Sequence, residues 1–186
     1  AKKGCWVKGP GEEFFQKVMD SHMKSRIVAE DLGRITPVVR KLIARLSFPG
    51  MKVLQFAFDE KRKTNTHFPH NHRKNSVVYT GTHDNNTTLG WYRKELTADG
   101  KKMLTKYIEK EVSADSIVRE MVQMAMKSVS KVAIIPMQDV LGLSEKSRMN
   151  NPATRKNNWQ WKMKTGLLKP SLAKDLRKLL EQYGRI

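Results

Sequence analysis

The chain has 186 residues, with 36 Lys and Arg against 18 Asp and Glu, which gives a formal net charge of +18. This length can bury a sizeable core as one domain, and the single cysteine, Cys5, excludes an internal disulfide. Because no run approaches the roughly 18 apolar residues that span a bilayer, we expect a soluble, cytoplasmic protein without a membrane partner.

The first predicted elements are a helix, a strand and a second helix. A Gly-Pro-Gly turn at residues 9–11 precedes two glutamates, and apolar side chains then recur at helical spacing over residues 12–22. Residues 27–29 predict a short buried strand. Thr-Pro at the start of residues 36–46 predicts a helix whose N-cap is the threonine, with an apolar stripe along it.

The middle of the chain predicts two strands and a helical region. Residues 51–58 are apolar except at two positions and predict a strand, which a polar loop follows over residues 59–76. Residues 77–80 predict the third strand. Residues 88–107 are predicted to be helical, with an interruption at the Asp-Gly pair 99–100.

The last third predicts a helix, a fourth strand and a terminal helix. Ser113 is expected to cap the first helix, and residues 132–135 predict a short strand that Pro136 ends. Residues 137–161 are expected to be mostly loop, and residues 170–184 predict the final helix. Strand and helix thus alternate four times, which favours an α/β fold with parallel strands and right-handed crossovers.

Two strand ends carry acidic side chains. Residues 79–88, Tyr-Thr-Gly-Thr-His-Asp-Asn-Asn-Thr-Thr, place His83 and Asp84 where a β-branched run gives way to a turn. The strand before Glu30 and Asp31 ends in the same way. Acids at the carboxyl ends of two strands are typical of the catalytic face of a β/α barrel. Neighbouring strand residues face opposite ways, so the pattern alone does not choose between Glu30 and Asp31.

Three histidines lie on the predicted polar loop. His67, His70 and His72 are spaced by three and two residues, which can converge on zinc. Neither Cys nor an acidic fourth partner accompanies them within residues 61–76, so we expect no metal and interpret the histidines as loop residues near the mouth of the site.

Five segments taken together resemble the amylomaltases, the 4-alpha-glucanotransferases of glycoside hydrolase family 77. They are Val28-Ala-Glu-Asp-Leu-Gly33, Phe48-Pro-Gly-Met-Lys-Val-Leu-Gln-Phe-Ala-Phe58, Thr80-Gly-Thr-His-Asp-Asn85, Pro136-Met-Gln-Asp139 and Arg148-Met-Asn150. The resemblance runs in order from Trp6 to Trp159. It implies a partial (β/α)8 TIM barrel with only the later strands and helices, because a complete barrel needs about 250 residues. Residues 1–186 would then be a single fragment, the C-terminal part of a catalytic barrel.

The resemblance also implies an activity and a set of site residues. The intact enzyme would transfer alpha-1,4-glucan segments between maltooligosaccharides by a retaining double displacement, without a cofactor. Glu30 would be the general acid/base, and Asp84 the carboxylate that stabilises the transition state. The implied substrate-binding residues are His83, Asn85, Trp91, Arg148 and Asn150. Core packing for Trp91 and Trp159, and loop bracing for Arg148 and Asn150, stay open as alternatives.

The sequence departs from the family pattern in three places. The family's nucleophile is an aspartate in an Arg-Ile-Asp-His-type segment, and no such segment occurs in these 186 residues. We therefore expect this polypeptide to be inactive by itself. Asn86 stands where the family usually has Asp, which we interpret as the loss of a charge beside Asp84. Ala153 stands where a Gly usually follows the proline.

The basic composition leaves an alternative function open. A strongly basic balance is typical of proteins that bind nucleic acid. Here the basic residues are spread along the chain and no nucleic-acid-binding motif accompanies them, so we expect a solvated surface and no nucleic-acid partner. The alternative is a non-catalytic basic module that binds glucan or nucleic acid. We also expect self-association, because a partial barrel exposes strand edges.

Overall fold

The computed structural model describes residues 4–5, 7–19, 27–59 and 65–186. The chain divides into two compact units, residues 1–51 and residues 52–186, here called the N-terminal unit and the C-terminal unit. None of the helices in the described ranges has the length and apolar character that crossing a bilayer requires. That both units belong to a single domain stays a prediction.

In the described part of the N-terminal unit the helices are α1 (Glu12–Val18) and α3 (Pro37–Arg45), both short. The predicted N-cap of α3 is confirmed, since Thr36 Oγ1 accepts a hydrogen bond from the backbone N–H of Val39 at 3.4 Å. The strand predicted at residues 27–29 is reduced to one parallel bridge, between Ala29 and Gly50. The end of the first predicted helix, including His22, lies outside the described residues.

A three-stranded sheet forms the centre of the fold, in the order β1–β2–β3. Its strands are β1 (Gly50–Val53), β2 (Ser76–Tyr79) and β3 (Val132–Ile134). The strands are parallel, and Val78 of β2 lies opposite Ala133 of β3. The predicted α/β class is therefore confirmed, as are the strands predicted near residues 77–80 and 132–135.

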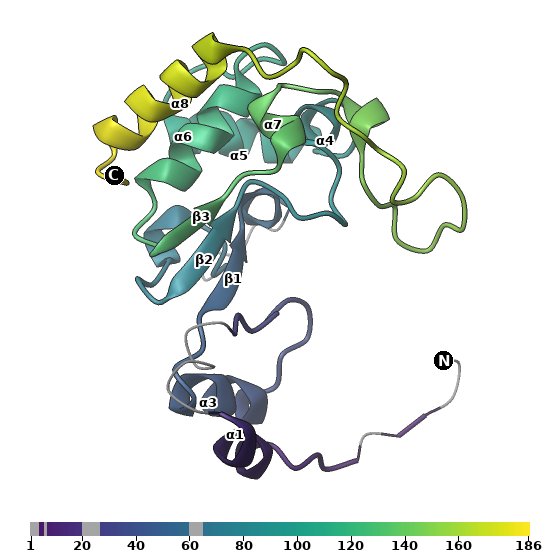
Figure 1. The fold of residues 1–186 in the computed structure, drawn as a ribbon, viewed down its shortest axis with the longest axis vertical. Coiled ribbons are helices and arrows are strands. Elements are labelled where there is room, and N and C mark those ends of the chain that lie inside the picture. Colours follow the sequence, from purple (N-terminus) through teal and green to yellow (C-terminus); the bar gives the residue numbers. More distant parts are fainter. Residues whose placement is uncertain (1–3, 6, 20–26, 60–64) are drawn as a thin grey trace. The chain divides into compact units, whose positions relative to one another are not determined.

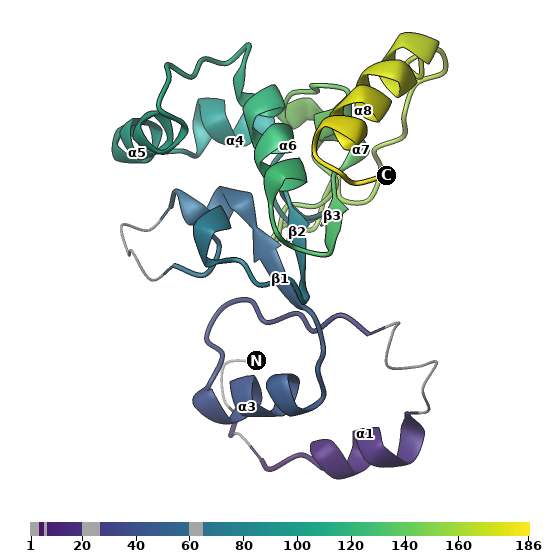
Figure 2. The ribbon, with the colours of Figure 1, turned by 90° about the vertical axis from the view of Figure 1, so that its left-hand side faces the viewer.

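Helices cover the sheet of the C-terminal unit. They are α4 (Thr88–Lys94), α5 (Ala98–Ile108), α6 (Ile117–Lys127), α7 (Met137–Val140) and α8 (Pro170–Gln182), with 3-10 turns η1 (Leu54–Ala57), η2 (Pro69–Asn71) and η3 (Glu145–Ser147). Helix α6 contacts α4, α7 and α8, as Figures 1 and 2 show. The terminal helix predicted from the Pro-Ser pair is confirmed as α8.

The strand predicted at residues 51–58 is too long. After Val53 the chain turns into η1, and Leu54 and Ala57 are both fully buried. Side chains three residues apart lie on the same face of a 3-10 helix, so this turn places both on the core side, where a strand would separate them. Burial of these side chains outweighs the local preference of the apolar run for extended backbone.

Two predicted helix boundaries are also wrong. The helical region 88–107 breaks before Thr97 rather than at residues 99–100, because Thr97 Oγ1 accepts from the N–H of Gly100 at 3.1 Å and caps α5. Helix α6 begins at Ile117 rather than beside Ser113, whose carbonyl accepts from the Ile117 N–H at 2.9 Å in the preceding turn. The prediction that residues 137–161 are mostly loop is confirmed, with α7 and η3 as the short helical segments within it.

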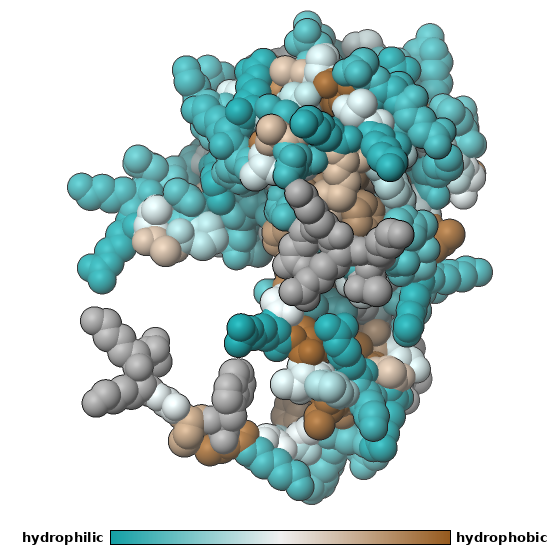
Figure 3. Space-filling model, turned by 180° about the vertical axis from the view of Figure 1, so that it is seen from behind, coloured by the Kyte–Doolittle hydropathy of each residue, from teal (hydrophilic) through white to brown (hydrophobic). Residues whose placement is uncertain are grey.

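The hydrophobic core belongs to the C-terminal unit. Its largest buried side chains come from η1 and the residue after it, and from α4, α5 and α6, and they are Leu54, Phe58, Trp91, Leu104, Ile117 and Met121. The face of the molecule seen in Figure 3 is by contrast mostly hydrophilic, as the composition leads us to expect. The core thus fixes the C-terminal ends of β2 and β3, from which the candidate site is built.

Candidate active site

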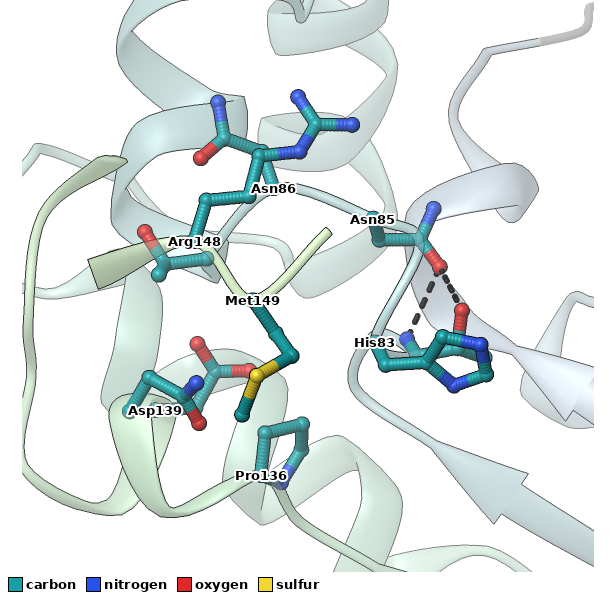
Figure 4. A pocket seen from close by; sticks show the side chains of 10 residues that line it. His83, Asn85, Asn86, Pro136, Asp139, Arg148 and Met149 are labelled. Carbon is teal, nitrogen blue, oxygen red and sulfur yellow. Dashed lines mark hydrogen bonds between the residues drawn. The ribbon is translucent and has the colours of Figure 1, made fainter. Parts of the chain in front are cut away.

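A pocket of about 120 Å³ lies at the carboxyl ends of β2 and β3. Residues of three segments line it, within 82–87 after β2, 136–139 after β3 and 148–149 after η3. Figure 4 shows the lining side chains, with Met149 and Asp139 of α7 among them. The carboxyl ends of parallel strands are the edge at which α/β proteins place ligands, so the location fits a binding site.

The carboxylate of Asp84 stands beside this pocket with two side chains in contact. Asn150 Nδ2 donates a hydrogen bond to Asp84 Oδ1 at 2.6 Å, and His83 Nε2 lies 3.3 Å from the same oxygen. The backbone of the turn is closed by Thr82, whose Oγ1 accepts from the Asp84 N–H at 3.3 Å. Asp84 remains half exposed, at 51 %, so the carboxylate is held in place and still open to a ligand.

Asn85 supports the same turn. Its Oδ1 accepts from the backbone N–H of Thr82 at 2.9 Å and from the Thr82 hydroxyl at 2.8 Å, the two bonds drawn in Figure 4. The Asn85 side chain thus reaches back to Thr82, three residues earlier, and closes the turn. The acceptor oxygen of Asn85 is thus used inside the turn, and a ligand could bind only its amide nitrogen.

Each of the three guanidinium nitrogens of Arg148 donates one hydrogen bond to the protein. Its Nη2 donates to the Asp84 carbonyl at 2.8 Å and its Nε to the Asn150 carbonyl at 2.8 Å. Its Nη1 pairs with Glu95 Oε1 at 3.0 Å. These contacts show loop bracing, one of the two roles that the sequence left open for Arg148; its role in substrate binding stays a prediction.

Asn86 contacts Glu95 and not Asp84. Its Nδ2 donates to Glu95 Oε1 at 2.8 Å, and its side chain is buried at 6 % exposure. The interpretation that Asn86 removes a charge beside Asp84 is therefore corrected, because the residue belongs to the contacts around Arg148. Sequence reasoning missed Glu95, since its partner Arg148 lies 53 positions away.

The two tryptophans considered as sugar platforms have different surroundings. Trp91 is 2 % exposed within the hydrophobic core, and its Nε1 lies 3.4 Å from Asp59 Oδ1. Core packing, the alternative role for Trp91, is what the structure shows. Trp159 is 62 % exposed, and its ring centroid lies 5.1 Å from that of His83. An exposed indole beside the site is the kind of surface on which a sugar ring stacks.

Asp139 lies beneath the pocket and is buried. Its carboxylate accepts from the hydroxyl of Thr80, from the N–H of Thr88 at 2.7 Å and from the Thr88 hydroxyl at 2.8 Å. Burial raises the pKa of this carboxyl, and the three hydrogen bonds oppose the shift. Asp139 therefore joins the end of β2 to the start of α4 and fixes the turn that carries Asp84.

Glu30 belongs to the N-terminal unit, where the bridge at Ala29 precedes it. The side chain of the next residue, Asp31, contacts the backbone of β1, where its Oδ1 accepts a hydrogen bond from the N–H of Met51 at 2.7 Å. Glu30 itself is exposed. Asp31 thus has a structural contact within its unit, whereas the side chain of Glu30 faces solvent.

The three loop histidines have separate partners. His67 Nδ1 accepts from the N–H of Val53 at 3.1 Å, and His70 Nδ1 lies 3.0 Å from the Tyr107 hydroxyl. His72 Nδ1 lies 2.7 Å from Ser128 Oγ. Over the ranges that the structure describes, no three His, Cys, Asp or Glu side chains gather as metal ligands would. The histidines stabilise the loop.

Comparison with known proteins shows a family to which this chain is similar. The sequence profile of the 4-alpha-glucanotransferases of glycoside hydrolase family 77 matches residues 1–169. The chain is 45 % identical to the chloroplastic/amyloplastic 4-alpha-glucanotransferase of Solanum tuberosum, with 98 % of this chain and 32 % of that protein covered. It is 42 % identical to the 4-alpha-glucanotransferase of Thermus thermophilus, with 100 % of this chain and 38 % of that protein covered. The chain therefore spans about a third of the length of these curated relatives.

A solved structure gives the same result. The amylomaltase of Streptococcus agalactiae, solved in complex with acarbose, superposes with a TM-score of 0.86 at 32 % identity. The superposition covers 97 % of this chain and 36 % of that one. The fold described above is thus that of part of an amylomaltase.

Proposed function

Since this chain belongs to the 4-alpha-glucanotransferase family, glycoside hydrolase family 77, we propose that it transfers alpha-1,4-glucan segments between maltooligosaccharides as part of a larger catalytic domain. The observation that carries this proposal is the Asp84 carboxylate, held by Asn150 and His83 at the open end of a parallel sheet. The similar amylomaltase solved with acarbose supports a glucan ligand for this site.

Asp84 would act on the charge that develops at the sugar ring. The transition state of glycosyl transfer resembles an oxocarbenium ion, which a fixed carboxylate stabilises. Asn150 holds one oxygen of Asp84 by a 2.6 Å hydrogen bond, so little rearrangement is needed as the charge forms. His83 and Trp159, adjacent and exposed, would bind hydroxyls and one face of a glucose unit.

Glu30 would be the general acid/base. In a retaining transfer this residue first protonates the leaving oxygen and then removes the proton of the acceptor hydroxyl. The exposed side chain of Glu30, next to an Asp31 that is hydrogen-bonded to Met51, supports this assignment over the alternative. Water must be kept from the glycosyl intermediate for transfer to exceed hydrolysis.

The nucleophile would come from residues outside this sequence. A retaining double displacement requires a carboxylate that forms the covalent glycosyl intermediate, and its segment does not occur within residues 1–186. We therefore propose that the 186 residues contribute the acid/base and the stabilising carboxylate, and that they are inactive without the nucleophile segment.

Maltotriose disproportionation by the full-length protein tests the proposal. Glu30→Gln and Asp84→Asn should each lower kcat by about 10²–10³-fold, since each removes a group that acts in the transition state. Asp175→Asn on the exposed face of α8 is the matched control and should leave kcat unchanged. Wild-type activity in either of the first two variants would refute the corresponding assignment.

A further inference from the structure

We propose that Glu95 is a positioning residue for Asp84 and that it acts through Arg148. The inference rests on the function proposed above and extends it to a residue that touches no substrate. Glu95 is the C-cap residue of α4, one residue beyond the last helical position. Its carboxylate is the only charged partner that the structure records for the Arg148 guanidinium among the described residues.

The contacts form one continuous path from Glu95 to the carboxylate of Asp84. Glu95 Oε1 accepts from Arg148 Nη1 at 3.0 Å. The other two contacts of Arg148 run to the Asp84 carbonyl and to the Asn150 carbonyl, each at 2.8 Å. Asn150 then donates to Asp84 Oδ1 at 2.6 Å. Arg148 therefore fixes the backbones of both residues whose side chains meet at the proposed catalytic oxygen.

The shape of the guanidinium makes Glu95 important for this geometry. The group is planar and its N–H donors keep a fixed angle to one another, so the contact at one nitrogen sets the direction of the others. With Nη1 held by Glu95, Nε and Nη2 are aimed at the two carbonyls. With a neutral side chain in place of the Glu95 carboxylate, the arginine has only neutral acceptors and loses its one ionic contact, the strongest of the three.

Asn86 orients the Glu95 carboxylate. Its buried Nδ2 donates to the same Oε1 that Arg148 contacts, at 2.8 Å. Glu95 is 41 % exposed and Arg148 only 22 %, so solvent reaches the carboxylate more than the guanidinium. A fixed donor from the core side keeps this partly exposed carboxylate turned towards Arg148.

If Glu95 had a purely structural role, it would hold α4 against η3. The neighbouring ion pair of Lys94 and Glu145 already connects these two elements. Lys94 Nζ lies 2.6 Å from Glu145 Oε1 and connects the same two elements. Lys94 touches neither Arg148 nor Asp84 among the recorded contacts of the described residues. Lys94→Gln is therefore a matched control, because it removes an ion pair between α4 and η3 and leaves the Arg148 contacts in place.

The test is maltotriose disproportionation by the full-length protein. Glu95→Gln should lower kcat about tenfold with little change in KM, since misplacement of a catalytic group slows the chemical step more than binding. Lys94→Gln should leave both constants unchanged. In an Arg148→Lys background, which already lacks the planar fork, Glu95→Gln should cause no further loss. Wild-type kcat in Glu95→Gln, or a full tenfold loss in the Arg148→Lys background, would overturn the proposal.

A second readout does not depend on activity. The Nε–H of Arg148 donates to the Asn150 carbonyl, so its NMR signal should exchange slowly with water in the parent and in Lys94→Gln. It should exchange at least about tenfold faster in Glu95→Gln. Unchanged exchange in that variant contradicts the positioning role. An inactive parent protein with the expected exchange pattern would instead count against the proposed function alone.

Discussion

At the residue scale, His72 is the clearest case in which burial changes a side chain's chemistry. It is 8 % exposed, its Nε2 donates to the His67 carbonyl at 3.0 Å, and its Nδ1 lies 2.7 Å from Ser128 Oγ. Burial, together with the nearby charges of Lys52 and His70, lowers the pKa of His72 from 6.5 to about 4. The imidazole is therefore neutral in the folded protein at neutral pH.

This depressed pKa predicts a loss of stability in acid. The unfolded imidazole binds a proton near pH 6.5 and the folded one only near pH 4, so His72 contributes its full stability above pH 6.5 and loses it as the pH falls towards 4. The free energy of unfolding of the parent should drop by roughly 2–3 kcal/mol more than that of His72→Gln between pH 7.5 and pH 4.5. Urea unfolding at both pH values measures this.

The comparison with His72→Gln isolates one group, since all other titrations are common to both proteins. If the free energies of unfolding of the parent and of His72→Gln differ by the same amount at both pH values, His72 is not held neutral by burial.

Single residues also show what the sequence can and cannot predict about the site. Glu30 and Asp84 are identifiable because each follows an apolar run within a motif, which is local information. The contacts around Asp84 are not local, because Asn150 lies 66 positions and Glu95 lies 11 positions away from it. The exposure of a tryptophan is equally non-local. Trp91 and Trp159 look alike in sequence, but one is in the core and the other is at the surface.

At the scale of elements, the C-terminal end of α6 is fixed by one side chain from the end of the chain. The guanidinium of Arg185 donates to four backbone carbonyls at 2.7–3.2 Å, those of Ala125, Met126, Ser128 and Ser130. The last carbonyls of a helix lack partners within the helix and carry its negative dipole end, which a cation stabilises. Arg185 therefore connects the residues after α8 to α6 and to the turn before β3.

Removal of this contact should destabilise the fold. Arg185→Ala should lower the free energy of unfolding by about 2–3 kcal/mol, because four hydrogen bonds from a charged donor to carbonyls of buried residues are lost. Arg185→Lys should recover only part of the loss, since one ammonium cannot reach four carbonyls. Denaturant unfolding measures both variants.

Arg177 provides the control for this experiment. It is an arginine of α8 whose Nε pairs with Glu181 at 3.0 Å on the exposed face, and an exposed pair of this kind contributes about 0.5 kcal/mol or less. Equal losses in Arg177→Ala and Arg185→Ala would mean that the four carbonyl contacts do not stabilise α6.

The beginnings of α3 and α8 are predictable from sequence, and the length of β1 is not. Thr36 with Pro37, and Pro170, mark their helices through local backbone chemistry, and both helices begin where expected. The end of β1 depends instead on which face of residues 54–57 meets the core, which only the assembled fold determines. The start of α5 has a local signal too, because Thr97 precedes the first turn, but the Asp-Gly pair obscures it.

At the scale of the whole molecule, the charge of +18 raises the alternative of nucleic-acid binding. The salt dependence of binding distinguishes this alternative from glucan binding. Contacts with phosphates release counterions, so binding to nucleic acid weakens steeply as salt rises, whereas binding to an uncharged sugar does not. Maltooligosaccharide affinity should change by less than about twofold between 50 and 300 mM salt. Titration calorimetry with maltoheptaose, and with a duplex DNA as comparison, measures both. Tight DNA binding without sugar binding would favour the basic module.

The exposed edge of the sheet predicts that the 186-residue polypeptide associates with itself. Strand β3 is at one end of the order β1–β2–β3, and two of its side chains are exposed and apolar, Val132 at 43 % and Ile134 at 45 %. An edge strand offers unpaired backbone N–H and C=O groups, and apolar side chains beside them favour pairing with another chain. We therefore expect the polypeptide to associate through β3.

A charged residue on this edge should prevent the association, because pairing would bring like charges together and bury them. Ile134→Lys should favour the monomer and raise the concentration at which the polypeptide associates by about tenfold. Light scattering over a range of concentrations measures this. Val129→Lys is the matched control. Val129 is also exposed and apolar, at 60 %, but lies outside β3, so the same substitution there adds the same charge without blocking the edge. A monomeric parent, or equal effects of the two substitutions, would show that β3 does not pair with a second copy.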